Sequence, residues 1–300
     1  AEVMREFYIN DRGAQMDLFG ASIMARAHGT EVPPDGYHGD YVSDLAETIV
    51  DRHPEFLDLT DDEQRIAFRE EGYRLQLAEQ REQLDEFRTH FDVWTSERDL
   101  HASAKVEHGI DVLRSRGSVF ESDGALWMRT TDFGDDKDRV LVRRDGSFTY
   151  FASDTAYYVD KRERGFDVCI YLLGADHHGY VGRLKAIAAC AGDDPEKNIE
   201  VPIGQMVRIV RAGRELRLSK RAGTMLTLAE VVDAAGVDPL RYTLSRYPVD
   251  SPLTVDVDQV TKQASDNPVF YVQYAHARLA SILRNADELG IDLKALRPEL

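Results

Sequence analysis

Residues 166–191 read FDVCIYLLGADHHGYVGRLKAIAACA. The uninterrupted apolar run at its start, with valine, isoleucine and tyrosine, predicts a strand over 166–173 that is buried on both faces in a parallel sheet. The small turn Gly-Ala-Asp then leads into a helix predicted from about His177 to Ala191. A buried strand followed by a helix is the repeating unit of an α/β fold. In such folds ligands bind beyond the carboxyl ends of the strands, which here are residues 174–178.

The flanking sequence repeats this alternation of strands and helices. A strand is predicted at the start of the chain, where VMREFYI (3–9) runs into an Asn-Asp-Arg-Gly turn. A helix is predicted over 152–164, and further short strands are predicted at 119–121, 125–129, 140–143, 199–203 and 206–210. Together these elements predict an α/β doubly wound sheet.

Long helical stretches surround this sheet. Residues 14–28 are predicted to form a helix, the segment from Asp40 to Arg116 to be almost entirely helical, and the chain past Thr227 to be helical to its end, with 267–289 the most periodic part. Residues 51–100 hold 15 acidic and 7 basic side chains. This charge favours a solvated helical insertion, and an acidic docking surface is the alternative.

Composition limits the class of protein. The chain has 300 residues, a net charge of −17 and 43 % hydrophobic residues, which is enough apolar material for a large core and excludes a disordered polyelectrolyte. The apolar runs are too short for a membrane span. The two cysteines, Cys169 and Cys190, cannot form a disulfide framework, so a reducing, cytoplasmic setting is predicted.

The basic residues are concentrated in one place. Taken alone, a charge of −17 argues against a nucleic-acid partner. However, residues 208–221, RIVRAGRELRLSKR, contain six basic side chains and one acid. A Gly-flanked loop with Ser and Lys suits phosphate chemistry, because hydroxyl and backbone N–H groups donate while Lys neutralises charge. A basic surface hairpin is the alternative.

Two other places can carry chemistry. Ser153 or Asp154 can cap the helix that follows, or Asp154 can face the strand ends as an anion for a cationic substrate. His177 and His178 invite a metal hypothesis, but no CxxC or HxxxH spacing supports it. Ser-His-Asp, GxSxG, Walker and GxGxxG patterns are absent from the sequence, which argues against hydrolase, P-loop and dinucleotide-binding classes.

Six sequence blocks carry a family resemblance. They are YINDRGAQ (8–15), DGALWMRTTDFGDDKDRVLVR (123–143), YFASDTAYYVDK (150–161), GADHHGYVGRLKA (174–186), LSKRAGT (218–224) and NPVFYVQYAHAR (267–278). LSKRAGT is similar to the KMSKS signature loop of class I aminoacyl-tRNA synthetases. The six blocks in this order resemble bacterial arginyl-tRNA synthetase.

The resemblance implies roles for particular residues. Arg217, Ser219 and Lys220 fall on the catalytic signature loop, where Lys220 would stabilise charge on the ATP phosphates. Tyr150, Asp154 and His177 fall on the positions that bind the arginine substrate. The ATP pocket would contain Gly174, Asp176, Met206, Val207, Leu218 and Arg221, and no metal-ligating residue is implied. A carboxylate with a tyrosine suits a guanidinium, which presents a rigid fork of donors.

One motif of the family is missing from these residues. Class I synthetases carry a HIGH-type motif after their first strand, and neither His38-Gly39 nor His108-Gly109-Ile110 has that strand-to-helix setting. In the family the motif precedes the YINDRGAQ block, so the sequence is expected to be an internal fragment, inactive by itself, or the ordered part of a longer chain. The Rossmann-like sheet is therefore expected to be incomplete at its N-terminus.

The resemblance also divides the chain and implies a reaction. The expected parts are a catalytic core (1–30), a mainly helical insertion (31–117), the core's second part with the signature loop (118–226), a helical stem-contact region (227–266) and the start of an all-α anticodon-binding domain (267–300). The implied enzyme activates L-arginine with ATP and Mg²⁺, without a structural metal, and transfers it to tRNA(Arg). A cytoplasmic monomer with no membrane contact is expected.

Two rival interpretations remain open. The chain can be a non-catalytic synthetase paralogue that binds RNA or a protein partner. It can also be a different class I synthetase or a nucleotidyltransferase with the same fold.

Overall fold

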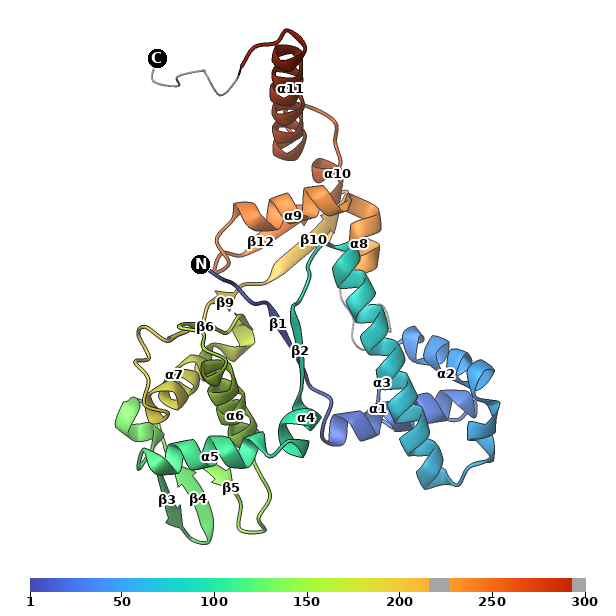
Figure 1. The fold of residues 1–300 in the computed structure, drawn as a ribbon. Helices are drawn as coiled ribbons and strands as arrows, with labels where there is room; N and C mark the ends of the chain where they lie inside the picture. Colours follow the sequence, from blue (N-terminus) through green and yellow to red (C-terminus); the bar gives the residue numbers. More distant parts are fainter. Residues whose placement is uncertain (216–226, 293–300) are drawn as a thin grey trace. The chain divides into compact units, whose positions relative to one another are not determined.

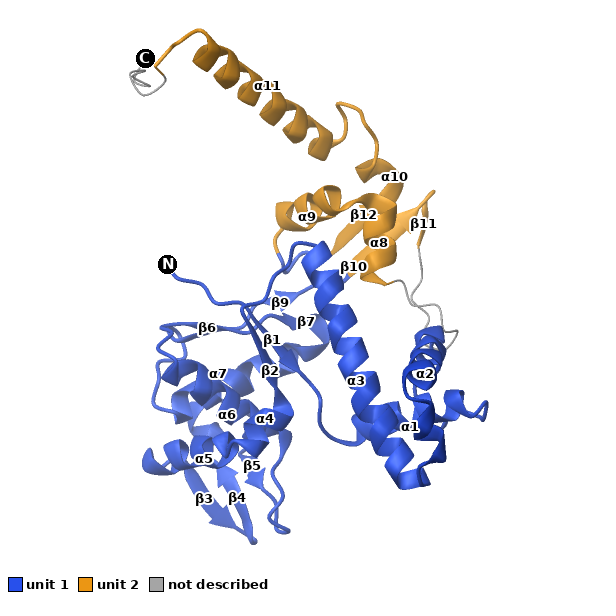
Figure 2. Ribbon diagram, turned by 45° about the vertical axis from the view of Figure 1, so that its right-hand side comes forward, with its two compact units in different colours: residues 1–206, 219–224, 249–251 blue, residues 207–218, 225–248, 252–300 orange. Residues whose placement is uncertain are grey.

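The computed structural model describes residues 1–215 and 227–292, and these form two compact units, coloured blue and orange in Figure 2. Unit 1 comprises residues 1–206 and 249–251, and unit 2 comprises the other described residues. The signature-loop residues Arg217, Leu218, Ser219, Lys220 and Arg221 lie outside the described residues. Within the described ranges, none of the helices combines the length and the apolarity that a membrane span requires.

Unit 1 alternates strands and helices (Figure 1). Its elements are β1 (Glu6–Ile9), α1 (Ala14–Ala27), α2 (Asp40–Arg52), η1 (Pro54–Asp58), α3 (Asp61–Glu86), β2 (Val93–Ser96), α4 (Glu97–Ala102), α5 (Lys105–Ser115), β3 (Val119–Ser122), β4 (Ala125–Met128), η2 (Thr130–Phe133), β5 (Arg139–Val142), α6 (Tyr150–Glu163), β6 (Cys169–Ile170), β7 (Leu173–Gly174), η3 (Ala175–Tyr180), α7 (Val181–Cys190), β8 (Ile199–Glu200) and β9 (Ile203–Gly204). The predicted helices at 14–28 and 152–164 and the three predicted strands between 119 and 143 are confirmed.

The first strand pairs with a strand that the sequence did not predict. β1 runs parallel to β2, with Ile9 opposite Ser96. β2 lies inside the segment predicted to be almost entirely helical, and that prediction is wrong there. Its sequence, VWTS, is rich in residues that favour strands, but long helical patterns flank it and hide the signal. Because the pair is parallel, β1 and β2 end at the same edge.

Two apolar cores stabilise unit 1. One joins α1, α2 and α3 through side chains such as Ile23, Ile49 and Phe68, all fully buried, so helix α1 of the predicted first core part shares an apolar core with the helices of the predicted insertion. The second lies among α5, α6, α7 and the three-stranded antiparallel sheet β3-β4-β5. Both free cysteines are buried in or at this second core, and burial raises the pKa of the Cys169 and Cys190 thiols.

The apolar run that opened the sequence forms two short strands rather than one. β6 pairs with β8, and β7 pairs with β9, each in parallel. Pro202 separates β8 from β9, because a proline has no N–H to continue a ladder. Ile170 and Leu172 are exposed, so the prediction of burial on both faces is wrong. The helix predicted from His177 begins only at Val181, after the 3₁₀ segment η3.

Unit 2 combines a small sheet with helices. Its elements are β10 (Val207–Arg211), β11 (Arg214–Glu215), α8 (Leu228–Ala235), α9 (Val237–Arg246), β12 (Leu253–Asp256), α10 (Val257–Val260) and α11 (Pro268–Glu288). β10 lies between antiparallel β11 and parallel β12. The prediction that the chain is helical past Thr227 is therefore wrong at β12. The predicted helix at 267–289 is confirmed as α11, which Asn267 caps by accepting the N–H of Val269.

Candidate functional site

The carboxyl ends of β1 and β2 place two polar turns side by side. β1 ends at Ile9 and continues into residues 10–13, while β2 ends at Ser96 and continues directly into Glu97, the first residue of α4. The Ser96 hydroxyl starts this helix by accepting the backbone N–H of Asp99 at 3.2 Å. This is the edge at which open parallel sheets bind their ligands.

Glu97 is a buried carboxylate without a complete set of partners. It is only 3 % exposed, and among the described residues its Oε1 atom accepts no hydrogen bond. Burial raises the pKa of Glu97, the Arg12 guanidinium opposes this shift, and the carboxylates of Asp154 and Asp11 reinforce it. An incoming cation would therefore stabilise the charged form of this side chain.

Asp154 is a second carboxylate in the same neighbourhood. It lies in α6, whose N-cap is Thr149, so neither Ser153 nor Asp154 caps the helix and that interpretation is wrong. Burial raises the pKa of Asp154 to about 6, and a hydrogen bond donated by the Tyr180 hydroxyl partly opposes the shift.

Tyr150 lies one helical turn before Asp154, on the same side of α6. The residue is 67 % exposed. Its hydroxyl approaches the β1 turn so closely that a Cβ atom at Gly13 would lie 3.3 Å from Oη. Gly13 also has φ +92°, a conformation that side-chain-bearing residues rarely adopt. The glycine therefore allows α6 and the β1 turn to meet.

Tyr8 lies near both carboxylates. Burial raises the pKa of the Tyr8 hydroxyl, and Glu97 and then Asp154 contribute in the same direction. We name Tyr8, Glu97, Tyr150, Asp154 and Tyr180 the strand-end cluster. Two buried carboxylates, of which Asp154 raises the pKa of Glu97, favour a bound cation, and tyrosine rings and hydroxyls add cation–π and hydrogen-bond contacts. Two carboxylates also match the fork of N–H donors on a guanidinium.

Comparison with known proteins identifies the family. The family described as tRNA synthetases class I (R), catalytic domain, matches residues 43–259. The arginine–tRNA ligase of Frankia alni is 57 % identical over 286 residues, which are 95 % of this chain and 52 % of the relative. That of Renibacterium salmoninarum is 53 % identical over 300 residues, 100 % of this chain and 54 % of the relative.

The chain belongs to the class I (R) tRNA synthetase family.

Solved structures agree with this assignment. A structure from Campylobacter jejuni described as an arginyl tRNA synthetase has a TM-score of 0.84 and 31 % identity, covering 98 % of this chain and 66 % of that one. Thermus thermophilus arginyl-tRNA synthetase, with a TM-score of 0.66, 20 % identity and coverage of 95 % and 58 %, shares the fold. The family resemblance and the α/β fold class are therefore confirmed. The chain spans about half the length of the curated relatives it matches.

The structure brings together only part of the residue set that the family resemblance implied. Tyr150 and Asp154 belong to the strand-end cluster, whereas His177 is exposed and lies 3.5 Å from Asp176 through its Nε2 atom. Gly174 ends β7, and a Cβ there would lie 2.7 Å from Asp176 Oδ1. Met206 and Val207 are exposed.

Three members of the cluster were not predicted. Glu97 could be recognised as a site residue only once the pairing of β1 with β2 was known. Tyr180, at the end of η3, contacts Asp154, whereas His177 is exposed. For Tyr8, the position in the YINDRGAQ block at the end of a predicted strand was an available signal.

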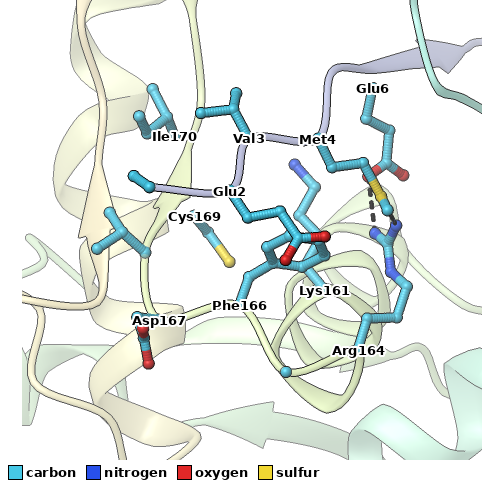
Figure 3. Close-up of a pocket in the computed structure, with 13 residues that line it drawn as sticks. Glu2, Val3, Met4, Glu6, Lys161, Arg164, Phe166, Asp167, Cys169 and Ile170 are labelled. Carbon is cyan, nitrogen blue, oxygen red and sulfur yellow. Dashed lines mark hydrogen bonds and ion pairs between the residues drawn. The ribbon is translucent and has the colours of Figure 1, made fainter.

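A pocket elsewhere in unit 1 does not contain the predicted site residues. Figure 3 shows this pocket of about 630 Å³ between the N-terminal residues and the turn after α6. Lys161 lines it, with Nζ 4.1 and 4.0 Å from the ring centroids of Tyr157 and Tyr171, and burial lowers the Lys161 pKa. Among the described residues, no group of three or more His, Cys, Asp or Glu side chains is arranged to hold a metal ion.

Proposed function

We propose that this chain is the arginine-binding catalytic part of an arginine–tRNA ligase. In the first step an oxygen of the arginine carboxylate attacks the α-phosphorus of ATP, and pyrophosphate leaves, giving arginyl-adenylate. In the second step a terminal ribose hydroxyl of tRNA(Arg) attacks the arginyl carbonyl, and AMP leaves. The names of the relatives at 57 % and 53 % identity support this proposal. Such a reaction asks mainly for positioning and charge stabilisation.

The observation that carries the proposal is the strand-end cluster. Asp154 and Glu97 supply two carboxylates in a buried setting, and Tyr150 supplies an exposed ring at its rim. We assign the arginine guanidinium to these carboxylates. Each charge-assisted hydrogen bond contributes about 1.5–3 kcal/mol, and lysine, with a single ammonium, cannot form the same bidentate contact.

The remaining assignments complete the proposal. ATP, with Mg²⁺ held mainly by its phosphates, is assigned to Gly174, Asp176, Met206, Val207, Leu218 and Arg221, with Arg217, Ser219 and Lys220 at the transferring phosphoryl group. His177 is kept as an arginine contact that would require movement of η3. The helical insertion, stem-contact region and anticodon-binding segment keep the boundaries given above. We propose a cytoplasmic monomer.

Calorimetric titration with L-arginine tests the arginine assignment. Asp154→Asn should weaken the Kd for arginine at least about tenfold, because it removes one charge-assisted contact. Glu163→Gln is the matched control, since Glu163 is a carboxylate on the same helix but pairs with His108 at 2.7 Å. Citrulline, which keeps the shape of arginine without its charge, should bind far more weakly. Equal arginine affinity in the Asp154 variant would contradict the assignment.

A kinetic variant tests the signature loop. Lys220→Ala, made in an active ligase that contains this sequence, should slow arginine-dependent ATP–pyrophosphate exchange about 10²–10³-fold. This is the usual loss of rate when one charge-stabilising donor is removed. Lys197→Ala is a suitable control, because Lys197 is exposed and pairs with Asp194 at 2.6 Å. An unchanged exchange rate would remove the role proposed for Lys220.

A further inference from the structure

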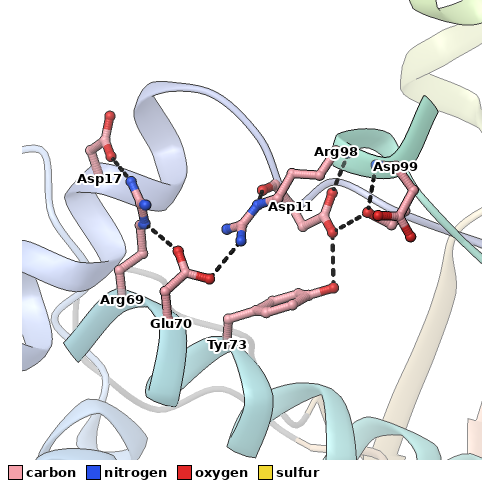
Figure 4. Close-up of polar contacts among 8 residues, drawn as sticks. Asp11, Asp17, Arg69, Glu70, Tyr73, Arg98 and Asp99 are labelled. Carbon is pink, nitrogen blue, oxygen red and sulfur yellow. Dashed lines mark hydrogen bonds and ion pairs between the residues drawn. The ribbon is translucent and has the colours of Figure 1, made fainter. Parts of the chain in front are cut away.

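Four residues, Asp11, Tyr73, Ser96 and Arg98, form a hydrogen-bonded clamp that holds the turn after β1. Asp11 is 1 % exposed, and its carboxylate accepts three hydrogen bonds, from the Tyr73 hydroxyl at 2.9 Å, the Ser96 hydroxyl at 2.6 Å and the backbone N–H of Arg98 at 3.0 Å (Figure 4). Burial and the bond to Asp11 raise the pKa of Tyr73 to about 12. Three donors satisfy most of the acceptor capacity of a buried carboxylate, so the turn is held firmly.

Helix α3 also holds the other side of the clamp. The Arg98 guanidinium donates to the Asp11 carbonyl at 2.8 Å and to Glu70 Oε2 at 2.5 Å, and it lies 5.3 Å from the centroid of the Tyr73 ring. Arg69 then links Glu70 to Asp17 on α1, at 2.8 and 2.6 Å. Two residues of α3 therefore reach the strand ends, while the same helix packs on α1.

The clamp adjoins the candidate site. Ser96 and Arg98, which grip Asp11, are the residues immediately before and after Glu97. Asp11 itself lies two residues before Gly13, where the Tyr150 hydroxyl approaches. A shift of Asp11 therefore moves both the carboxylate of Glu97 and the turn that faces Tyr150.

We propose that Tyr73 and Glu70 of α3 are positioning residues that set the arginine affinity of the strand-end cluster through Asp11 and Arg98. The inference rests on the proposed arginine-binding function. It gives the helical insertion a part in substrate binding although neither residue belongs to the cluster. Preorganised ligand sites depend on such supporting contacts, because small displacements of a binding group cost much of its interaction energy.

Tyr73→Phe tests the clamp with the least disturbance, because it removes one hydroxyl and keeps the ring. Tyr41→Phe is the matched control, since Tyr41 is a partly buried tyrosine that packs against the apolar core of α1, α2 and α3. We expect Tyr73→Phe to weaken the Kd for L-arginine about three- to tenfold, the equivalent of one net hydrogen bond. It should also speed amide hydrogen exchange at residues 10–13 and 96–99, and Tyr41→Phe should change neither quantity.

A second variant and a second measurement separate the possible failures. Glu70→Gln loosens Arg98 from the other side and should speed exchange at the same amides. Wild-type arginine affinity and wild-type exchange in Tyr73→Phe would overturn the inference. If the unaltered chain does not bind arginine, the proposed function fails, and the exchange data alone then decide whether α3 positions the strand ends.

Discussion

The Tyr180 hydroxyl donates a hydrogen bond to Asp154 Oδ2, joining the end of η3 to α6 across 26 residues. Asp154 is otherwise in a setting that disfavours its charge, since burial raises its pKa to about 6. The tyrosine bond opposes that shift and helps to keep the carboxylate ionised near neutral pH. The carboxylate proposed to bind a cation therefore has a pKa only slightly below neutral pH.

Arginine binding should therefore depend on pH. Asp154 is mostly charged at pH 8 and mostly protonated at pH 5, while the arginine guanidinium stays protonated throughout. The affinity should fall about tenfold between these pH values, since protonation of one group with a pKa near 6 removes the counter-charge. Calorimetry across this range in the unaltered chain checks the slope. A flat profile would show that Asp154 does not carry the charge that arginine meets.

The same burial predicts a conflict between stability and binding. The folded-state pKa of Asp154 lies above its ordinary value, so the folded chain binds the proton more tightly and this group destabilises the fold as pH rises through 4–6. Asp154→Asn removes the buried charge and keeps an acceptor for Tyr180. It should raise the free energy of unfolding by about 1–3 kcal/mol at pH 8 and by much less at pH 4.

Thermal melts of the variant and the unaltered chain at both pH values measure this difference. The control is Glu163→Gln, which alters an exposed carboxylate of the same helix. A lower melting temperature for Asp154→Asn at pH 8 would contradict the burial argument.

Tyr180→Phe should move the pH profile in a defined direction. Removing the donor takes away a contact that favours the ionised form, so the pKa of Asp154 rises further and the midpoint for arginine binding shifts to higher pH. Tyr158→Phe is the matched control, because it also removes a tyrosine–aspartate bond, that of Tyr158 to Asp193 at 2.8 Å. The control should change stability and leave the midpoint where it was. Identical midpoints in all three proteins would refute the link.

The family resemblance, not the local pattern, singled out Tyr150 together with Asp154. The helix predicted over 152–164 contains Asp154 but not Tyr150, whereas α6 begins at Tyr150 and places the two residues about one turn apart. Glu97 has no such signal, because its burial and its neighbours follow from the pairing of β2 with β1, far away in the sequence. Pairing partners of parallel strands cannot be deduced from period-2 alternation over four residues.

The prediction of one long buried strand over 166–173 was wrong for a related reason. The run from 166 to 173 is apolar throughout, but its partner segment contains Pro202, which breaks the ladder into the short pairs β6–β8 and β7–β9. Exposure of Ile170 and Leu172 then depends on what lies next to the strand, which composition does not encode. The strand character of this run was predictable, whereas its pairing and its burial were not.

Gly13 provides a test of the contact between the β1 turn and α6. Gly13→Ala adds a Cβ at φ +92°, 3.3 Å from the Tyr150 hydroxyl, so both backbone strain and displacement of the tyrosine are expected. Gly146→Ala is the matched control, because Gly146 has φ +81° and its Cβ would meet no atom within 4 Å. Each variant should lose about 1–3 kcal/mol of unfolding free energy, measured by denaturant titration.

Only Gly13→Ala should weaken arginine binding, by about three- to tenfold if Tyr150 contributes one net contact to the ligand. The comparison isolates the Tyr150 contact, since strain at a positive φ is common to both variants. Double substitution with Tyr150→Phe sharpens the result, because without the hydroxyl the added Cβ has no close neighbour there and the binding loss should shrink. An equal loss of arginine affinity in Gly13→Ala and Gly146→Ala would show that the turn acts on the site only through global stability.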